Sequence, residues 1–88
     1  MQILQSSTFK RAYKKLQDNQ RQVVNQAIRA IAENPDIGVR KKGDLAYLLV
    51  HKFKCASQQY LLAYHAESDR LTLINLGPHE NFYRDLKR

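Results

Sequence analysis

The chain has 88 residues and a formal net charge of +7, from 15 Lys and Arg against 8 Asp and Glu. This length favours one domain with a small core, and a composition that is 43% hydrophobic, with 3 Gly and 2 Pro, excludes a chain disordered by composition. The single cysteine, Cys55, excludes an internal disulfide and cannot by itself form a thiolate zinc site. We therefore expect one domain over residues 1–88. Because the sequence shows no signal peptide and no apolar run of about 18 residues, we expect it in the cytoplasm, without a membrane segment.

Basic residues exceed acidic ones in both halves of the chain. Residues 1–44 carry nine Lys and Arg against four Asp and Glu, and residues 45–88 carry six against four. Each phosphate that such a surface neutralises releases counterions, so a polyanion is the expected partner. A basic protein without any nucleic-acid role is the alternative that charge leaves open.

The N-terminal segment predicts a short strand followed by two helices. Residues 1–6 favour a strand, and Ser6, Ser7 and Thr8 are candidates for a helix N-cap. Helical spacing then places apolar residues on one face, with basic residues opposite: Phe9, Ala12, Tyr13 and Leu16 against Lys10, Arg11, Lys14 and Lys15.

A second helix is expected after Asp18-Asn19, which can cap it. Its apolar residues, from Val23 to Ala32, repeat at helical spacing until Asn34-Pro35, where the residue before proline disfavours the helix. Two short helices with a tight connection predict an antiparallel helical hairpin.

Residues 35–44 read as a loop that contains the basic run Arg40, Lys41 and Lys42. Either this loop is a solvated connection, or its basic run contacts RNA or an acidic partner. The sequence does not choose between them.

The second half of the chain has the period of strands. Residues 45–54, 59–66 and 71–76 are apolar or β-branched, and the short spacers between them predict antiparallel neighbours. Alternation along the first of these strands puts Lys52 and Lys54 on one face and His51 and Phe53 on the other.

After Gly77-Pro78, residues 79–88 predict a short helix. The resulting order, β-α-α-β-β-β-α, indicates an α+β fold in which the helices pack against an antiparallel sheet.

The residue types favour chemistry that uses no metal. The three histidines His51, His65 and His79 lack the spacing of a metal site, and no nucleophile elbow is present. RNA supplies its own nucleophile in the 2′-OH, so cleavage requires groups that deprotonate it, neutralise the phosphate and protonate the leaving oxygen. Lys, Arg, His and Tyr side chains can fill all three roles.

Two local motifs resemble the RelE/ParE superfamily of bacterial type II toxins, as do the size, basicity and element order of the whole chain. Residues 51–54 (HKFK), a short turn and residues 59–64 (QYLLAY) are similar to the Lys-apolar-Lys, turn, Tyr-x-x-x-Tyr pattern of ribosome-dependent, RelE-type mRNA endonucleases. The ending Gly77-x-His79-x-x-x-Tyr83 is similar to that of the YafQ-like branch. The resemblance implies a RelE-like fold and cleavage of mRNA on the ribosome.

This resemblance also implies the roles of individual residues. Lys52 and Lys54 would belong to the catalytic surface, His79 would transfer protons, and Tyr83 would stack on a base. Members of the family often carry an arginine at the position of Leu61, and its absence here would pass phosphate binding to other residues: Arg84, Arg70, Arg40, Lys41 and Lys42.

The expected partners follow from the same resemblance: the ribosome with its mRNA, and a small, acidic, partly disordered antitoxin that also binds DNA. No cofactor is expected. Two other functions stay open, because a fold does not fix an activity: inhibition of DNA gyrase in the manner of ParE, and non-catalytic binding of nucleic acid.

Overall fold

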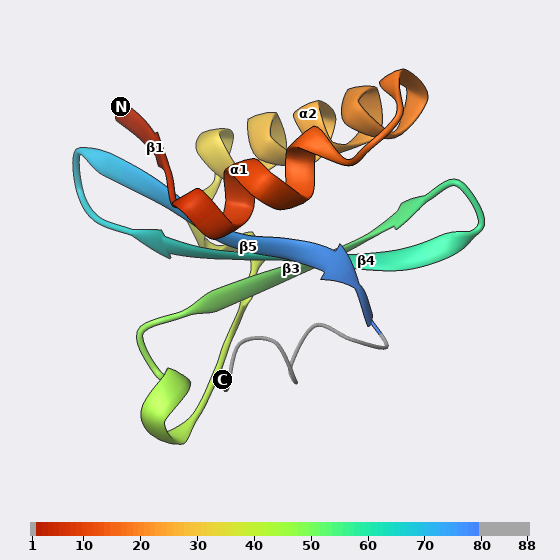
Figure 1. The fold of residues 1–88 in the computed structure, drawn as a ribbon. Coiled ribbons are helices and arrows are strands. Elements are labelled where there is room, and N and C mark those ends of the chain that lie inside the picture. The colour runs from red at the N-terminus through yellow and green to blue at the C-terminus, as the bar shows by residue number, and fades with distance from the viewer. Residues whose placement is uncertain (1, 80–88) are drawn as a thin grey trace.

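The computed structural model describes residues 2–79, and its two helices and five strands form two layers (Figure 1). Two short 3-10 turns, η1 (Pro35–Ile37) and η2 (Gly43–Leu45), lie in the connection after the second helix. The C-terminal helix expected over residues 79–88 lies outside the described residues, apart from His79. The helices and strands are β1 (Gln2–Gln5), α1 (Ser7–Lys14), α2 (Asp18–Glu33), β2 (Val39–Arg40), β3 (Leu49–Cys55), β4 (Gln58–Ala66) and β5 (Arg70–Pro78).

The sheet has the strand order β1-β5-β4-β3-β2. Strands β3, β4 and β5 are antiparallel neighbours, as predicted. Strand β2 pairs with β3, also antiparallel, while β1 pairs with β5 in parallel. Helices α1 and α2 cover one face of this sheet, α1 against β5 and α2 against β3 (Figure 1). The predicted α+β class with a helical hairpin on the sheet is therefore confirmed.

Each helix begins at a polar cap. Ser6 caps α1 as predicted: its Oγ accepts a hydrogen bond from the Phe9 backbone N–H at 3.0 Å and donates one to the Ile74 carbonyl at 2.5 Å. The N-cap of α2 is Gln17, so the prediction of Asp18-Asn19 as the cap was wrong. The Gln17 backbone N–H donates to Gln20 Oε1 at 2.9 Å, which satisfies one of the free backbone groups at this end.

The segment between α2 and β3 differs from the prediction in two ways. The expected loop contains the edge strand β2, which is too short to give a period in the sequence; its Val39 and Arg40 pair with Val50 and Leu49. The strand expected from residue 45 begins only at Leu49, because η2 and a turn occupy the first half of the apolar run. An apolar run shorter than a helix does not reveal its conformation by period alone.

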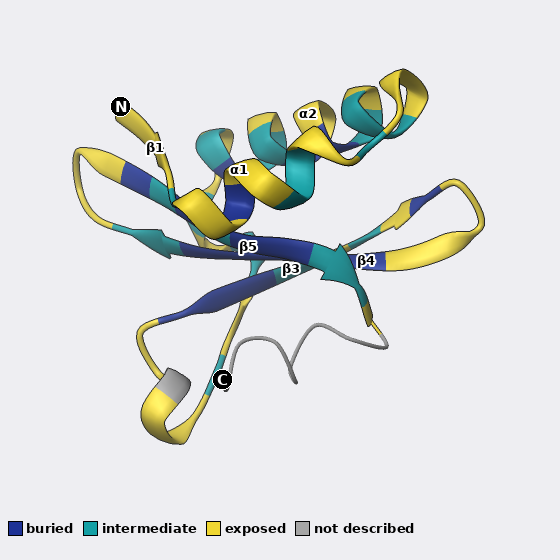
Figure 2. Ribbon diagram, viewed as in Figure 1, coloured by how far each residue is buried: buried dark blue, intermediate teal, exposed yellow. Residues whose placement is uncertain are grey.

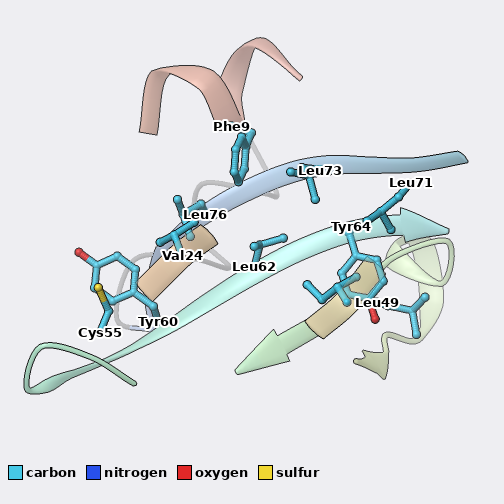
Figure 3. Close-up of a cluster of buried hydrophobic side chains, with 11 residues drawn as sticks. Phe9, Val24, Leu49, Cys55, Tyr60, Leu62, Tyr64, Leu71, Leu73 and Leu76 are labelled. Carbon is cyan, nitrogen blue, oxygen red and sulfur yellow. The ribbon is translucent and has the colours of Figure 1, made fainter. Parts of the chain in front are cut away.

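The main core lies between the sheet and the helices (Figures 2 and 3). It consists of buried side chains from both helices and from β3, β4 and β5: Phe9, Val24, Ile31, Leu49, Cys55, Tyr60, Leu62, Tyr64, Leu71, Leu73 and Leu76. A second, smaller apolar cluster, formed by Leu48, Val50, Leu61 and Ala63, belongs to the opposite face of the sheet. Strand β4 contributes buried residues to both clusters, as a central strand does.

Tyr64 joins the sheet to the chain that leaves α2. Its hydroxyl donates to the Pro35 carbonyl at 2.6 Å and accepts from the Gly38 backbone N–H at 2.9 Å. Gly38 lies so close that a Cβ on it would be 2.6 Å from the Tyr64 hydroxyl oxygen. These contacts fix where β2 begins.

We predict that Tyr64→Phe lowers the free energy of unfolding by about 1–3 kcal/mol, because it leaves a carbonyl and an N–H without their partner. Chemical denaturation of the two proteins measures the difference. Tyr47→Phe is a matched control, since the Tyr47 side chain is 53% exposed and should tolerate the loss of its hydroxyl. Equal stability of the Tyr64→Phe variant and the parent would contradict this role of the hydroxyl.

We predict that Gly38→Ala is also destabilising, by about 1–3 kcal/mol, because the added methyl group must displace the Tyr64 ring. In the double variant Gly38→Ala/Tyr64→Phe, the loss of stability should be smaller than the sum of the losses in the two single variants. The reason is that the oxygen nearest to the new methyl group is gone. Strictly additive costs in denaturation experiments would show that the two residues do not interact.

Alkaline conditions should destabilise the fold. Burial is the main reason why the pKa values of Tyr60 and Tyr64 are raised. The folded chain therefore holds these protons more tightly than the unfolded chain, so the contribution of these two tyrosines to stability is constant up to about pH 10, the ordinary tyrosine pKa, and falls above it. Denaturation between about pH 8 and pH 11 should show this fall, and it should be smaller in Tyr64→Phe.

Candidate nucleic-acid interface

Lys52 and Lys54 lie side by side on the face of the sheet opposite the helices. Both are exposed, and they pair across β3 and β4 with Leu61 and Gln59. The residue between them, Phe53, packs into the helix-side core, and its ring stacks on that of His51 at 5.9 Å. The predicted division of this strand into a lysine face and an aromatic face is confirmed.

His79 follows the end of β5 at the same end of the sheet. Strands β3 and β5 flank β4 and run in the same direction; Tyr60 of β4 pairs with Pro78, and the neighbouring Gln59 pairs with Lys54. His79 thus comes next to the Lys54–Gln59 pair, about two strand spacings, or roughly 10 Å, from the Lys54 backbone. Long side chains can span such a distance around one phosphate group.

Gln59 is the residue of this end that the sequence analysis missed. It is exposed, and the strand register puts its carboxamide position between those of Lys54 and His79. It directly precedes the Tyr-x-x-x-Tyr pattern but is not one of its defining residues, and only the pairing of β4 with both neighbours reveals its position. It adds a hydrogen-bond donor and acceptor to the cationic groups.

Within residues 2–79, neither Lys52 nor Lys54 has an ion pair. Ion pairs elsewhere in this part of the chain join Arg21 to Asp18 and join Glu67 to both His65 and Arg70. No acidic residue lies on β3 or β4 or in the turn that joins them. The two ammonium groups therefore form a positive surface that attracts anions.

The other predicted phosphate-binding residues do not gather at this end. Arg70 begins β5, whose nine residues separate it by roughly 26 Å from Pro78, and its Nε lies 3.9 Å from Glu67. Arg40 pairs with Leu49, so it lies on the helix side of the sheet, and its guanidinium donates to the Ala46 carbonyl at 3.0 Å. These positions do not support the expectation that Arg70 or Arg40 binds a phosphate beside Lys52.

Two of the remaining candidates lie away from the site, and two cannot be placed. Lys41 and Lys42 follow Arg40 near the start of β3, away from His79. Tyr83 and Arg84 lie outside the described residues.

Leu61 occupies the centre of the interface without taking part in polar chemistry. It is fully buried in the smaller apolar cluster, opposite both Lys52 and Gly77. An arginine at this position would have to displace that cluster, so Leu61 serves the packing of this face of the sheet. Any anion bound here must be held by the polar and charged groups around the cluster.

Two further titratable groups face the helix side and take no part in the interface. Burial lowers the pKa of His51, which favours its neutral form, and burial raises the pKa of the Cys55 thiol. Cys55 lies against the start of α2, with its Sγ 3.9 Å from the Gln20 carbonyl oxygen. A buried thiol of raised pKa is a poor nucleophile.

Over residues 2–79, no three side chains of the types His, Cys, Asp and Glu come together in a way that would hold a metal ion. In the same range, no helix has the length and apolar character needed to cross a membrane.

Comparison with known proteins extends the likeness over nearly the whole chain. Residues 3–87 match the model of a family described as the ParE-like toxin of type II bacterial toxin–antitoxin systems. No curated protein matches.

Solved structures share the fold at low identity. The isolated RelE toxin of E. coli is 20% identical, with a TM-score of 0.67, over 99% of this chain and 96% of that one. A chain of the intact E. coli RelBE toxin–antitoxin complex gives 19% identity and a TM-score of 0.68, over 86% of this chain and 93% of that one. The conserved hypothetical protein HP0894 of Helicobacter pylori is 21% identical, with a TM-score of 0.56, over 91% of this chain and 96% of that one.

At these identities the solved structures establish only the fold, whereas the family match identifies the class of protein, a toxin. Both agree with the resemblance seen in the motifs of residues 51–64. The chain belongs to the ParE-like toxins of bacterial type II toxin–antitoxin systems, within the RelE/ParE superfamily.

Proposed function

We propose that this toxin is an endoribonuclease that cuts mRNA on the ribosome by attack of the 2′-OH on the adjacent phosphate. The observation that carries the proposal is the pair of exposed lysines, Lys52 and Lys54, at the end of the sheet where His79 follows β5. Cleavage by this route needs cationic groups and a group that transfers protons near neutral pH, which lysine and histidine supply.

In the proposed reaction, the ammonium groups of Lys52 and Lys54 stabilise the negative charge that builds up on the phosphate. A general base among Lys52, Lys54 and His79 accepts the proton of the 2′-OH. His79 or a lysine then donates a proton to the leaving 5′ oxygen, so the products are a 2′,3′-cyclic phosphate and a free 5′-OH. Tyr83 holds a base in line by stacking, a contact worth about 1–3 kcal/mol.

The proposal includes the partners of the toxin. In the E. coli RelBE toxin–antitoxin complex, a chain of the same fold occurs together with its partner. By analogy, we propose a small acidic antitoxin that neutralises this chain and also binds DNA, with the toxin acting in the cytoplasm. A net charge of +7 suits both an acidic protein and the phosphates of ribosomal RNA.

Inhibition of DNA gyrase is the second candidate. It is supported by the ParE-like description of the matching family, and by the buried Leu61 at a position where RelE-type enzymes often have arginine. A gyrase inhibitor needs no proton-transfer group, so its toxicity should not depend on His79.

We predict that Lys52→Ala, Lys54→Ala and His79→Ala each lower mRNA cleavage about 100-fold or more, because each removes charge stabilisation or proton transfer. Primer extension on a reporter mRNA, after brief induction of the toxin in cells, measures the cuts. In the parent they should be in frame and disappear when translation is blocked.

The double variant Lys10→Ala/Lys14→Ala is the matched control. It removes two exposed lysines from α1, on the far side of the sheet, and should cut mRNA like the parent. Intact mRNA with accumulation of cleaved DNA in arrested cells would replace the proposal with gyrase inhibition. Intact mRNA without growth arrest would leave a binding module.

A further inference from the structure

The end of the sheet away from His79 carries an exposed aromatic side chain that the proposed reaction does not use. The connection through η2 and the turn between β4 and β5 both lie at this end, opposite the β3–β4 turn (Figure 1). Tyr47 follows η2, and its side chain is 53% exposed. A tyrosine left in solvent at a site that also holds basic residues is a candidate contact for a ligand with a flat ring.

The ring of Tyr47 lies on the face of the sheet that also carries Lys52 and Lys54. It meets the ring of His65 edge-on, with 6.3 Å between the centroids and 74° between the planes. The two neighbours of His65 along β4 pack into the helix-side core. Because side chains alternate along a strand, His65 points to the opposite face, the one without helices.

The backbone on both sides of Tyr47 is fixed. The carbonyl of Ala46 accepts a hydrogen bond from the Arg40 guanidinium at 3.0 Å. The carbonyl of Leu48 accepts one from the Lys41 backbone N–H at 3.0 Å, and the Leu48 side chain is fully buried. An aromatic side chain on such a support loses little conformational freedom when it binds a ligand.

His65, which supports the ring of Tyr47, is itself held from another side. Its Nδ1 lies 3.9 Å from Glu67 Oε1, and the same oxygen lies 3.9 Å from Arg70 Nε. The pair formed by Tyr47 and His65 is therefore tied both to the connection before β3 and to the start of β5.

Charge at this end of the sheet is more nearly balanced than at the lysine end. Both signs are present in the segments around Tyr47: Arg40, Lys41, Lys42 and Arg70 against Asp44, Glu67 and Asp69. A bare phosphate would therefore prefer the surface of Lys52 and Lys54. What this end offers instead is a ring to stack on, with cations at its side.

We propose that Tyr47, supported by His65, stacks on a base of the same RNA strand whose phosphate Lys52 and Lys54 hold. This inference rests on the proposed function and adds a second contact with the substrate to it. Sheet faces that present aromatic side chains bind single-stranded RNA in this way, because every base has a flat face to stack.

The strand register gives the span between the two contacts. Lys52 pairs with Leu61, and His65 lies four residues further along β4, which corresponds to roughly 14 Å. Nucleotides of a stacked strand advance by about 3.4 Å each, so about four of them cover this span, and fewer do so in an extended strand. One strand that crosses the helix-free face can therefore reach both contacts.

A base held at a constant distance from the cleaved bond should influence where the toxin cuts. Stacking strength is the source of such preferences, and the larger rings of purines cover more of an aromatic side chain. We therefore expect cut sites to share a preference for a purine at one fixed position, within about four nucleotides of the cut.

The binding test uses the full parent chain with 13C-labelled aromatic rings and a short oligoadenylate. The RNA carries 2′-O-methyl groups, which block its nucleophile and prevent cleavage. NMR should show upfield shifts of the Tyr47 ring resonances as the RNA is added, because a stacked base shields them. An abasic strand of the same length keeps the phosphates and sugars; it should leave these resonances in place and bind about tenfold or more weakly.

Matched variants separate stacking from other effects of substitution. Tyr47→Ala should bind the oligoadenylate about tenfold or more weakly than the parent, whereas Tyr47→Phe keeps the ring and should bind like the parent. Ile3→Ala is the control: it shortens another exposed apolar side chain, 43% exposed, on the helix side of the sheet edge at β1. It should bind like the parent.

Three results would each overturn the proposal: unshifted Tyr47 resonances, equal affinity for the abasic strand, or equal affinity of Tyr47→Ala and the parent. Denaturation of Tyr47→Ala checks that the variant is folded. If it is not, the resonance shifts in the parent and the comparison with the abasic strand still decide the question.

The outcome is separable from that of the cleavage experiment. Stacking on Tyr47 in a protein that cuts no mRNA in cells would refute the proposed function and leave a contact for RNA that is not cut. Cleavage by Tyr47→Ala at the same positions and with the same purine preference as the parent would refute the stacking contact and leave the proposed function in place.

Discussion

The burial of β4 on both of its faces is the constraint on which the rest of this small domain depends. From Tyr60 to Tyr64 every residue is buried, and the strand is paired on both sides. One face receives the helices, and the other carries the smaller apolar cluster. A domain of so few residues has little apolar surface to bury, and β4 enlarges the core because its side chains pack on both faces of the sheet. The hydroxyl of Tyr64 then extends this rigid centre to the connection after α2.

Because the centre is apolar on both faces, charge can gather only where the sheet reaches solvent. The β3–β4 hairpin extends past the helices, and its outer residues are exposed (Figure 2). Lys52 and Lys54 stand on the face of this hairpin opposite the helices, directly beside the buried Val50 and Leu61. Their backbone is held by the ladder to β4, which fixes the separation of the two Cα atoms. A site that needs two cations at a fixed separation gains from such a support.

The sequence predicted what depends on local period. The Ser6 cap, the end of α2 before Pro35 and the opposite faces of Lys52 and Phe53 follow from spacing, and the structure agrees. Pairing between distant segments leaves no such trace: neither the parallel contact of β1 with β5 nor the two-residue strand β2 has a local signal. The same limit explains the site. The motif identified the lysines, whereas the position of Gln59 and the separation of Arg70 from them depend on register.

The parallel pairing of the first strand with the last also constrains how the protein is made. Ser6 bonds to the Ile74 carbonyl across 68 positions of sequence, and β1 finds its only neighbour among residues 2–79 in β5. Contacts between such distant residues form late and slow the folding of a small domain. During translation β1 and α1 must wait until β5 has emerged, since α1 packs on that strand as well. A nascent chain therefore lacks the completed sheet. The fold of the toxin can be completed only after β5 has left the exit tunnel of the ribosome that makes it.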